Sequence, residues 1–499
     1  MKNFEQAKAY FFSGLKLFEK ENYKEAEVQF IKSLELFPDR ASTLTNLSAT
    51  QIKLKKYSEA EKSATQAISL DSRNSEPWFN LGLIEKKNNN LNRAIEYFDK
   101  AIQLKPDYAE AWANKAVSLI ELERYDEALA HYDQAIKLKP DYAEAWANKG
   151  VTLSRIKRYD EALAHYDKAI QLKPDYAEAW ANKGVTLSRL KRYGEDIAHY
   201  DQAIQLKPDY AEAWANKGAT LYDLKRYDEA IAHCNQAIQL KPDHANAYYS
   251  RGMSCLALEQ LIPASDDLAL AIKYNSDKKE KIDFILASLK GENQPSAPPK
   301  EFITELFDDY AAKFESHLVN ALKYRAHDVL YRNLKEIIED DLDILDLGCG
   351  TGLMGELLKP HAEKLTGIDI SSKIIEEARA KNVYDQLYQS DLNEFLQANT
   401  ANFDLVSATD VLIYMGDLSK AFLNVYKALR KGGYFCFTVE KLDAGEYFLN
   451  KTLRYSHSVE YCENLAKNNQ FQIVSNETNV IREENGVDVL GLYFVLRKM

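Results

Sequence analysis

Small, polar and aromatic positions repeat with a fixed period over residues 1–278. A tryptophan stands every 34 residues in the phrase Ala-Trp-Ala-Asn-Lys, at Trp112, Trp146, Trp180 and Trp214. Trp78 and Tyr248 continue the series at either end. Small residues recur at the position of a close contact between two helices: Gly14, Ser48, Gly82, Ala116, Gly150, Gly184, Gly218 and Gly252. Such a period predicts a stack of repeated helical units.

Alanines mark a further repeated position, and prolines close most units. The alanines are Ala26, Ala60, Ala94, Ala128, Ala162, Ala230 and Ala264, and the prolines are Pro38, Pro106, Pro140, Pro174, Pro208 and Pro242. Proline stops a helix because it lacks the backbone N–H. We count eight units, which start near Ala7, Ala41, Ser75, Ala109, Ala143, Ala177, Ala211 and Ala245. Asp196 replaces the alanine of the sixth unit, and we expect that unit to be looser because a packed carboxylate needs a partner.

The pattern resembles the tetratricopeptide repeat, a helix–turn–helix unit whose copies form a right-handed solenoid with a concave face. The resemblance implies a protein or peptide partner in that groove. The sixth position of six consecutive units is asparagine: Asn46, Asn80, Asn114, Asn148, Asn182 and Asn216. These amides resemble the asparagine ladder in the repeat domain of O-linked N-acetylglucosamine transferase, which grips peptide backbone. The alternative, that asparagine is simply common at this position, stays open.

The pattern changes after the repeats. Residues 277–290 are charged and then helical, and we expect them to cap the solenoid. Residues 291–299 form a linker on composition, because their prolines favour an extended, semi-rigid spacer. The predicted organisation is a repeat domain at 1–278, a capping helix and linker at 279–300, and a second domain at 301–499.

Short apolar runs alternate with helical patterns in this second domain, which predicts an α/β fold. The predicted strands are 343–347, 365–369, 386–389, 403–408, 434–439, 471–474 and 489–496, and the last two are expected to pair antiparallel. Helices are predicted at 302–318, 322–338 and 418–430, where the last ends before Gly432 and Gly433. Another helix starts after Ser371, its expected N-cap.

Three glycines follow the first predicted strand at alternate positions, Gly348, Gly350 and Gly352. Glycine allows a positive φ or a close approach of backbone to a ligand. The helix predicted from Leu353 directs its free N–H groups to the same place. The second predicted strand ends at Asp369, whose carboxylate can accept both hydroxyls of a ribose. Together, the glycines and the acid predict a nucleoside-binding turn.

The run from Asp346 to Gly352 resembles the acid-x-Gly-x-Gly-x-Gly motif of class I S-adenosylmethionine-dependent methyltransferases. A dinucleotide fingerprint needs a glycine where Leu353 stands, so the spacing argues against a dehydrogenase. The resemblance runs from about residue 301 to the end. It implies a Rossmann-like, seven-stranded α/β domain after the all-α solenoid, with S-adenosylmethionine as cofactor. The implied cofactor contacts are Asp346, Gly348, Gly350, Gly352, Asp369, Ile370, Asp391, Leu392 and Thr409. The resemblance also implies a lid helix whose Tyr310 or Phe314 covers the cofactor. The alternative is that the aromatic side chains of that helix only belong to the hydrophobic core.

Candidates for the acceptor end of the site follow the fourth and fifth strands. Methyl transfer needs a base only when the nucleophile keeps its proton, and His457 is the best base by its ordinary pKa. A surface histidine at a helix start is the alternative. Asp410 and Tyr414 lie where ligands enter open α/β sheets and are weaker candidates, as is Glu440.

Composition limits the partners and the compartment. The net charge of −12 disfavours a nucleic acid or an anionic membrane as main partner. Five unevenly spread cysteines without a Cys-x-x-Cys pair favour a reducing, cytoplasmic setting with no zinc site, and we expect no metal. We expect no signal peptide and no membrane span, because no apolar run reaches about 18 residues.

Three functions agree with these patterns. The first is a methyltransferase whose repeats recruit a protein, either as the substrate or as its carrier. The second is a small-molecule methyltransferase that uses the repeats only for assembly. The third is a scaffold with an inactive cofactor fold, against which the intact acid and glycine positions argue. No residue pattern identifies the methyl acceptor.

Overall fold

The computed structural model describes residues 2–291, 294–484 and 486–499. The chain divides into two compact units, Met1–Ser254 and Cys255–Met499. This division falls between residues 254 and 255, whereas the predicted domain limits are at residues 278 and 300. Those limits stay a prediction. Among the helices formed by the described residues, none combines the length and the apolar character needed to cross a bilayer.

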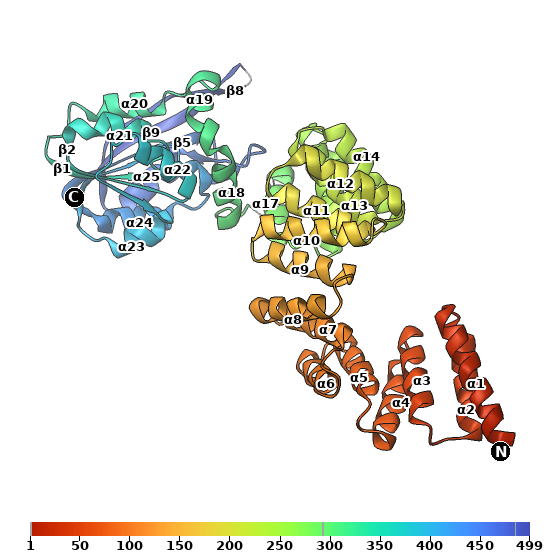
Figure 1. The fold of residues 1–499 in the computed structure, drawn as a ribbon. Coiled ribbons are helices and arrows are strands. Elements are labelled where there is room, and N and C mark those ends of the chain that lie inside the picture. Colours follow the sequence, from red (N-terminus) through yellow and green to blue (C-terminus); the bar gives the residue numbers. More distant parts are fainter. Residues whose placement is uncertain (1, 292–293, 485) are drawn as a thin grey trace. The chain divides into compact units, whose positions relative to one another are not determined.

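Helix hairpins follow one another from the N-terminus (Figure 1). The helices are α1 (Lys2–Glu19), α2 (Tyr23–Leu36), α3 (Ala41–Lys53), α4 (Tyr57–Leu70), α5 (Ser75–Lys87), α6 (Leu91–Leu104), α7 (Ala109–Glu121), α8 (Tyr125–Leu138), α9 (Ala143–Arg155), α10 (Tyr159–Leu172), α11 (Ala177–Arg189), α12 (Tyr193–Leu206), α13 (Ala211–Asp223), α14 (Tyr227–Leu240), α15 (Ala245–Ala257) and α16 (Leu261–Lys273). Within the described residues the two helices of each hairpin pack together from α1 and α2 to α13 and α14, which confirms the predicted all-α solenoid.

The recurring residues join each hairpin to the turn before it. The indole Nε1 donates a hydrogen bond of 3.0 Å to a proline carbonyl six residues earlier in four units: Trp112 to Pro106, Trp146 to Pro140, Trp180 to Pro174 and Trp214 to Pro208. The carbonyl of the turn is therefore satisfied although it lies outside a helix. The small residues are required by close packing, because a Cβ on Gly150 would lie 2.8 Å from the Tyr166 ring.

Asp196 occupies the position that holds alanine in the neighbouring units and is completely buried in α12. Its Oδ2 accepts a hydrogen bond of 2.9 Å from Thr220 Oγ1, whereas its Oδ1 has no hydrogen-bond partner among the described residues. Burial raises the pKa of Asp196 to about 6. The sixth unit therefore keeps its helices around a poorly satisfied carboxylate.

The second unit continues with α17 (Lys279–Lys290), α18 (Lys300–Tyr310), α19 (Phe314–Ser316) and α20 (Ala326–Leu334). Its strands are β1 (Leu342–Leu347), β2 (Ala362–Asp369), β3 (Gln386–Gln389), β4 (Phe403–Ala408), β5 (Leu429–Leu442), β6 (Tyr447–Leu449), β7 (Tyr455–Ser458), β8 (Phe471–Glu484) and β9 (Val487–Lys498). The remaining helices are α21 (Leu353–Leu358), α22 (Ser372–Ala380), α23 (Leu392–Ala398), α24 (Ser419–Ala428) and α25 (Val459–Asn468). The predicted N-cap is confirmed, since Ser371 Oγ accepts from Ile374 N.

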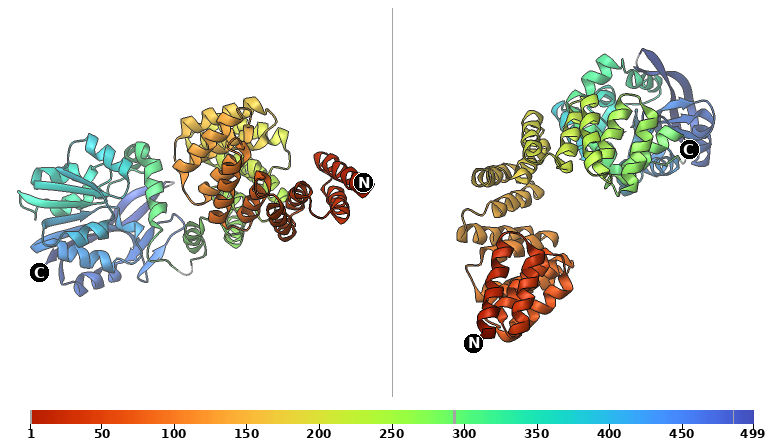
Figure 2. Two further views of the ribbon diagram at one scale, coloured as in Figure 1. Left: turned by 60° about the horizontal axis from the view of Figure 1, so that its bottom comes forward. Right: turned by 90° about the vertical axis from the view of Figure 1, so that its right-hand side faces the viewer.

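One sheet runs in the order β3-β2-β1-β4-β5-β7-β6, and β9 pairs with both β5 and β8. Strands β1 to β5 are parallel, and β9 is antiparallel to β5 and β8. The left view of Figure 2 shows these strands with helices on both sides. This arrangement confirms the Rossmann-like α/β fold.

Two expectations about the strands are wrong. The sheet has nine strands in the described part of the chain instead of seven, because β6 and β7 form an additional hairpin after β5. Residues Tyr455–Ser458, for which no strand is predicted, form strand β7, which is parallel to the end of β5. In addition, β5 already begins at Leu429 and runs through Gly432 and Gly433 with an irregular register against β4.

Successive strand residues alternate between two covered faces of the sheet, as expected when helices lie on both sides. Ile344 of β1 packs in a cluster with Leu330 of α20. Its neighbour Leu345 packs in the other cluster with Phe422 of α24 and Leu465 of α25. The sheet is therefore held from both sides.

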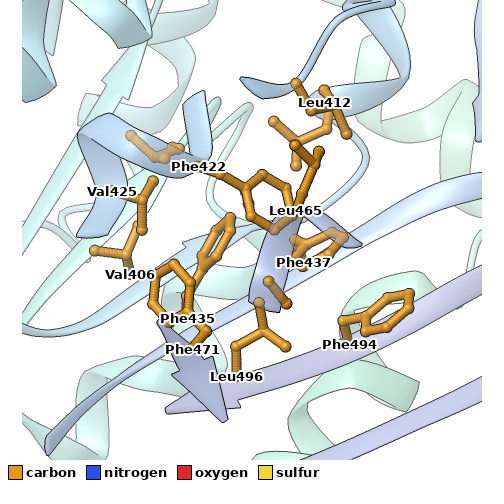
Figure 3. Packing of buried hydrophobic residues seen from close by; sticks show 14 of the residues in the cluster. Val406, Leu412, Phe422, Val425, Phe435, Phe437, Leu465, Phe471, Phe494 and Leu496 are labelled. Carbon is orange, nitrogen blue, oxygen red and sulfur yellow. The ribbon is translucent and has the colours of Figure 1, made fainter. Parts of the chain in front are cut away.

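Phenylalanines fill the centre of the second cluster (Figure 3). The rings of Phe437 in β5 and Phe494 in β9 stack at 5.1 Å with an interplanar angle of 6°, and Phe422 meets Phe437 edge-on. Burying one such side chain stabilises the fold by about 1.5–3 kcal/mol. This packing fixes the strand ends that carry the polar residues described below.

The predicted spacer between repeats and sheet is instead bound to the second unit. Tyr455 Oη donates a hydrogen bond of 2.7 Å to Pro295 O, and the backbone N–H groups of Gly416 and Asp417 donate to Ser296 O at 2.8 and 3.1 Å. In α17, Phe284 packs on Tyr455 and on Phe302 of α18. Residues 292–293 of the predicted linker lie outside the described residues.

We predict that Asp196→Ala stabilises the first unit by about 1–3 kcal/mol at pH 7.5, because it removes a buried, half-satisfied carboxylate. The folded pKa of about 6 lies above the ordinary 3.8, so stability of the wild type falls as pH rises through this window. The advantage of the variant therefore shrinks as pH decreases from 6 towards 4.

The measurement is urea unfolding followed by tryptophan fluorescence. All five tryptophans, Trp78 to Trp214, lie in the first unit, so their signal reports on it alone. The matched control is Asp167→Ala, which removes an exposed carboxylate paired with Lys183 at 2.6 Å and is expected to change stability by less than about 1 kcal/mol. Equal effects of the two substitutions would contradict the prediction.

Candidate active site

A cavity of about 270 Å³ lies at the carboxyl ends of β1, β2, β3 and β4. The strand order reverses between β1 and β4, and open α/β sheets bind ligands at such a point. The lining includes residues from the glycine loop, from the ends of these strands and from helices α18 to α21. Nearly all the positions expected to bind a nucleoside therefore meet in one place.

The glycine loop adopts the backbone conformations that its composition predicts. Gly348, Gly350 and Gly352 have φ values of 61°, 55° and 99°, which disfavour a side chain. A Cβ on Gly348 would lie 2.4 Å from Val411 Cγ2. The loop is tied to β2 by a hydrogen bond of 2.9 Å from Cys349 N to Ile368 O. Backbone therefore forms this wall of the cavity; Gly352 itself is not among the lining residues that the structure describes.

Asp369 lies in the cavity at the end of β2. Its two carboxylate oxygens accept hydrogen bonds from Gly350 N at 3.2 Å and from Ser371 N at 3.0 Å. Burial raises its pKa to about 6, which those backbone N–H groups oppose. Ile370 follows in the lining and adds apolar surface. The acid is thus oriented by the glycine loop itself.

Asp346 also lines the cavity, but both of its oxygens have partners inside the protein. Ser407 Oγ of β4 donates to it at 2.5 Å, and Tyr384 Oη donates at 2.7 Å. Burial raises the pKa of Asp346 to about 6. This acid therefore braces β1 against β4 beneath the glycine loop.

Asp391 and Leu392 line the end of the cavity next to β3. Asp391 Oδ1 caps α23 by accepting from the backbone N–H groups of Asn393 at 2.9 Å and Glu394 at 3.1 Å. The cap fixes the carboxylate and leaves its second oxygen for a ligand. Leu392 and Ile370 supply apolar surface for a flat ring.

Thr409 and Asp410 directly follow β4 and line the cavity. Thr409 Oγ1 is buried without a hydrogen-bond partner in the part of the chain that the structure describes. Asp410 has a φ of 58° and lies 3.4 Å from Arg482 Nη1 of β8. Arg482 is 1% exposed and also contacts Glu440 and Glu484, which in turn contact Arg454. Asp410 therefore belongs to a buried ionic cluster and is the member of that cluster that lines the cavity.

Tyr414 and His457 have different positions. Tyr414 lines the cavity, and its ring meets Phe307 of α18 edge-on at 5.1 Å. Burial raises its pKa to about 12. His457 of β7 is fully buried, its Nε2 donates a hydrogen bond of 2.9 Å to Gly416 O, and it is not among the described lining residues. Burial lowers its pKa to about 4.

The alternative of a surface histidine is wrong, because His457 has no exposed surface. Its catalytic role stays a prediction without support from this geometry. Glu440, the other weak candidate, is buried in the ionic cluster and does not line the cavity in the described residues.

The predicted lid helix breaks at Ala311 into short turns, and Phe314 rather than Tyr310 lines the cavity among its described residues. A Cβ on Gly350 would lie 3.4 Å from the Phe314 ring, so this ring covers the glycine loop. Tyr310 instead contacts His317. Thr351 Oγ1 fastens the lid by donating to Glu315 Oε2 at 2.6 Å.

Sequence reasoning missed several lining residues, and four of them come from segments without a recognisable motif. Tyr324 and His327 come from the segment around α20, before any recognisable motif, and Ala297 and Pro298 come from the predicted spacer. Their composition gives no local signal of a ligand site. Only the tertiary packing of these segments brings them to the strand ends.

The six asparagines of the first unit fall into two groups. Asn46, Asn80 and Asn114 donate to the backbone oxygens of Ser42, Thr45 and Glu110, respectively. Asn148, Asn182 and Asn216 are half-buried, and the structure records no side-chain hydrogen bond for these three described residues. The amides of the central units are thus available to a ligand.

The second unit has a Rossmann-like α/β fold with a cavity at its strand ends, and it follows a run of helix hairpins. A family model described as a methyltransferase domain matches residues 345–437. Models described as tetratricopeptide repeats match residues 41–74, 75–108, 113–177, 158–211 and 211–244. The chain therefore carries both kinds of module, and the methyltransferase domain implies S-adenosylmethionine as the cofactor.

Two of the curated relatives are O-methyltransferases. The malonyl-[acyl-carrier protein] O-methyltransferase of Enterobacter lignolyticus (strain SCF1) is 29% identical over 149 residues, which are 30% of this chain and 57% of that protein. The ubiquinone biosynthesis O-methyltransferase of Coxiella burnetii is 27% identical over 125 residues, or 24% of this chain and 51% of that protein. The chain spans about half the length of these relatives. A solved S-adenosylmethionine-dependent methyltransferase from Methanosarcina mazei is 18% identical, covers 34% of this chain and 97% of its own, and superposes with a TM-score of 0.30.

The residues of the cavity fit S-adenosylmethionine, whose sulfonium and amino groups are cationic. Four acids line the cavity, Asp346, Asp369, Asp391 and Asp410, whereas Lys300 is the one lysine or arginine among the described lining residues. Lys300 is already paired with Glu394 at 2.9 Å. The charge of the cavity therefore favours a cation, and Thr409 Oγ1 offers an unused polar atom.

We predict that Gly348→Ala lowers the affinity for S-adenosylmethionine by more than about tenfold, because the Cβ clashes with Val411 and the positive φ adds strain of about 1–3 kcal/mol. The matched control is Gly432→Ala in β5. Gly432 also has a positive φ, of 83°, but its Cβ would meet nothing closer than 3.8 Å, and it does not line the cavity in the described residues. Calorimetric titration of both variants checks the prediction, and equal affinities would contradict it.

Proposed function

We propose that the protein is an S-adenosylmethionine-dependent methyltransferase whose repeats hold a protein or peptide that is, or carries, the methyl acceptor. The observation that supports the enzymatic part is the single cavity that brings together the glycine loop, Asp369 and the unpartnered Thr409. The O-methyltransferases among the relatives agree with this reaction class.

The residues of the cavity divide the work of holding the cofactor. Asp369 would accept the ribose hydroxyls, Asp391 the adenine amino group, and Ile370 and Leu392 would pack on the ring. When bound, S-adenosylmethionine supplies a methyl group on a sulfonium, an excellent leaving group. The chain then has mainly to position the acceptor and exclude water. Phe314 and Phe307 serve that exclusion by covering the glycine loop and contacting Tyr414.

The recruiting part of the proposal rests on the central units of the solenoid. Asn148, Asn182 and Asn216 stand at the same position of three successive first helices, α9, α11 and α13. Each amide can both donate and accept, so the series can bind an extended backbone without reading its side chains. The alternative use of the repeats for assembly alone predicts no effect of these amides on methyl transfer.

We predict that Asp369→Asn weakens binding of S-adenosylmethionine about 10- to 100-fold, since hydrogen bonds to a charged group contribute about 1.5–3 kcal/mol. Binding to the wild type is also expected to weaken as pH falls below 6, where the carboxylate of Asp369, with a pKa of about 6, takes up a proton. Titration calorimetry between pH 5 and 8 measures both effects.

The control for this substitution is Asp443→Asn, because Asp443 is 95% exposed and lies outside the described cavity lining. Its affinity should equal that of the wild type. A wild-type protein that gives no binding heat at any pH would favour the inactive scaffold instead.

We predict that the triple substitution of Asn148, Asn182 and Asn216 by alanine leaves the affinity for S-adenosylmethionine unchanged and lowers methyl transfer to acceptors in a cell lysate at least about tenfold. The reason is that only the recruiting surface changes. Transfer of radiolabelled methyl groups, resolved by size, provides the measurement.

The matched control replaces Gln171, Gln205 and Gln239 by alanine. These are exposed amides at one repeated position of the second helices α10, α12 and α14. Unchanged transfer by the asparagine variant, or equal losses in both triple variants, would argue against recruitment through the asparagines.

A further inference from the structure

His327 is another histidine of the second unit, and in contrast to His457 it lines the cavity. It lies in the first turn of α20, where its ring stacks on Tyr324 at 5.4 Å with an interplanar angle of 13°. Its Nδ1 is buried without a hydrogen-bond partner among the described residues. A buried, unpaired ring nitrogen is costly to a fold unless a ligand uses it.

Tyr324 places this histidine near the ends of β1 and β4. Tyr324 lines the same cavity, and burial raises its pKa with added contributions from Asp410 and Asp346. His327 and Tyr324 therefore line the same cavity as the carboxyl ends of β1 and β4, where the methyl group would be presented. His327 has no role among the residues that are proposed to hold the cofactor.

The surroundings of His327 favour a neutral ring that can accept a proton, and nearby carboxylates can stabilise the ring once it is protonated. Burial lowers its pKa from the ordinary 6.5, so the ring is mainly neutral at pH 7.5. The carboxylates facing it are Asp328 of α20, Glu356 of α21 and Glu315 of α19, and the opposing charge is Lys381 after α22. Nε2 lies 3.7 Å from Asp328 Oδ1, and in the neutral tautomer that carries its proton on Nε2 the ring leaves Nδ1 as an acceptor.

We propose that His327 is the general base of this methyltransferase and that the acceptor group is an uncharged hydroxyl whose proton passes to His327 Nδ1. This inference rests on the proposed function. In the step, the O–H bond breaks and its proton goes to Nδ1 while the oxygen forms a bond to the methyl carbon. The bond from that carbon to the sulfonium sulfur breaks, and its electron pair remains on sulfur, which becomes a neutral thioether.

The charge of the cavity supports a hydroxyl rather than a carboxylate. A carboxylate would enter beside four acids, and Lys300, the single lysine or arginine of the described lining, is paired with Glu394. The buried guanidinium of Arg482 is already contacted by Asp410, Glu440 and Glu484. Bringing an anion into such surroundings is unfavourable. An uncharged hydroxyl avoids that repulsion, but it needs a base.

The experiment compares full-length wild type, His327→Asn and the control His361→Asn. Asparagine keeps a polar group near Nδ1 but cannot take up a proton. His361 is bonded to Asp340 at 2.8 Å and does not line the described cavity. The acceptor probes are p-cresol, whose pKa is about 10 as for tyrosine, pentafluorophenol, which is already ionised at pH 7.5, and 4-methylbenzoate. Radiolabel transfer gives kcat/KM, and calorimetry gives the affinity for S-adenosylmethionine.

We expect the wild type to methylate p-cresol in preference to 4-methylbenzoate. His327→Asn should lower kcat/KM for p-cresol about 10²- to 10⁴-fold and leave pentafluorophenol within about threefold, because that acceptor has no proton to give. The affinity for S-adenosylmethionine should stay within about threefold in both variants. In the wild type, kcat/KM should rise with pH through a pKa below 6.5, and this limb should be absent in His327→Asn.

Four results would overturn the proposal. These are equal losses with the two phenols, a tenfold loss of cofactor affinity in His327→Asn, preferred methylation of 4-methylbenzoate, and no transfer to either phenol by a wild type that binds the cofactor. The second result would assign His327 to cofactor binding. A wild type that binds no S-adenosylmethionine would refute the proposed function itself, which separates the two failures.

Discussion

The cavity depends on one backbone constraint, the run of left-handed glycines that follows β1. Because Gly348 has no Cβ, Val411 can pack against the loop, and because Gly350 has none, Phe314 of the lid can cover it. The N–H of Gly350 also orients Asp369. One turn thus sets the positions of the segment after β4, of the lid and of the acid after β2. A Cβ on Gly348 would displace Val411, which lies far away in the sequence, whereas at Gly350 the positive φ is what disfavours a side chain.

Several carboxylates line the cavity, and hydrogen bonds and a buried guanidinium within the fold partly compensate for their negative charge. Asp346 and Asp369 both have a pKa near 6 because they are buried, and each is retained by two hydrogen bonds from neighbouring strands or loops. Asp410 instead faces the guanidinium of Arg482, which burial would disfavour without its three carboxylates. Burying charges is costly unless they are paired. A cationic ligand supplies the remaining compensation, which links the stability of this region to its occupancy.

Local pattern predicted the elements whose burial is visible in the sequence. The 34-residue period gave the hairpins, and the limits of β3 and β4 agree with their apolar runs. The hairpin of β6 and β7 was missed because Tyr455–Ser458 has no alternation of polarity, and all four residues are buried only through packing on β5 and Phe284. His457 was chosen for its ordinary pKa, which burial then lowers. His327 carries no motif, and only the folding of α20 onto the sheet brings it to the cavity.

The proline-rich segment shows why composition alone misjudges a connection. Prolines leave backbone carbonyls without local partners, and a spacer in water would satisfy them with solvent. Here Tyr455 Oη and the N–H groups of Gly416 and Asp417 bind the carbonyls of Pro295 and Ser296, and the next residues, Ala297 and Pro298, line the cavity. Moving this segment must therefore break bonds to the loop after β4 and open the cavity wall in the same step. The connection to the repeats is part of the site, so a change in its position would alter the cavity that receives the cofactor.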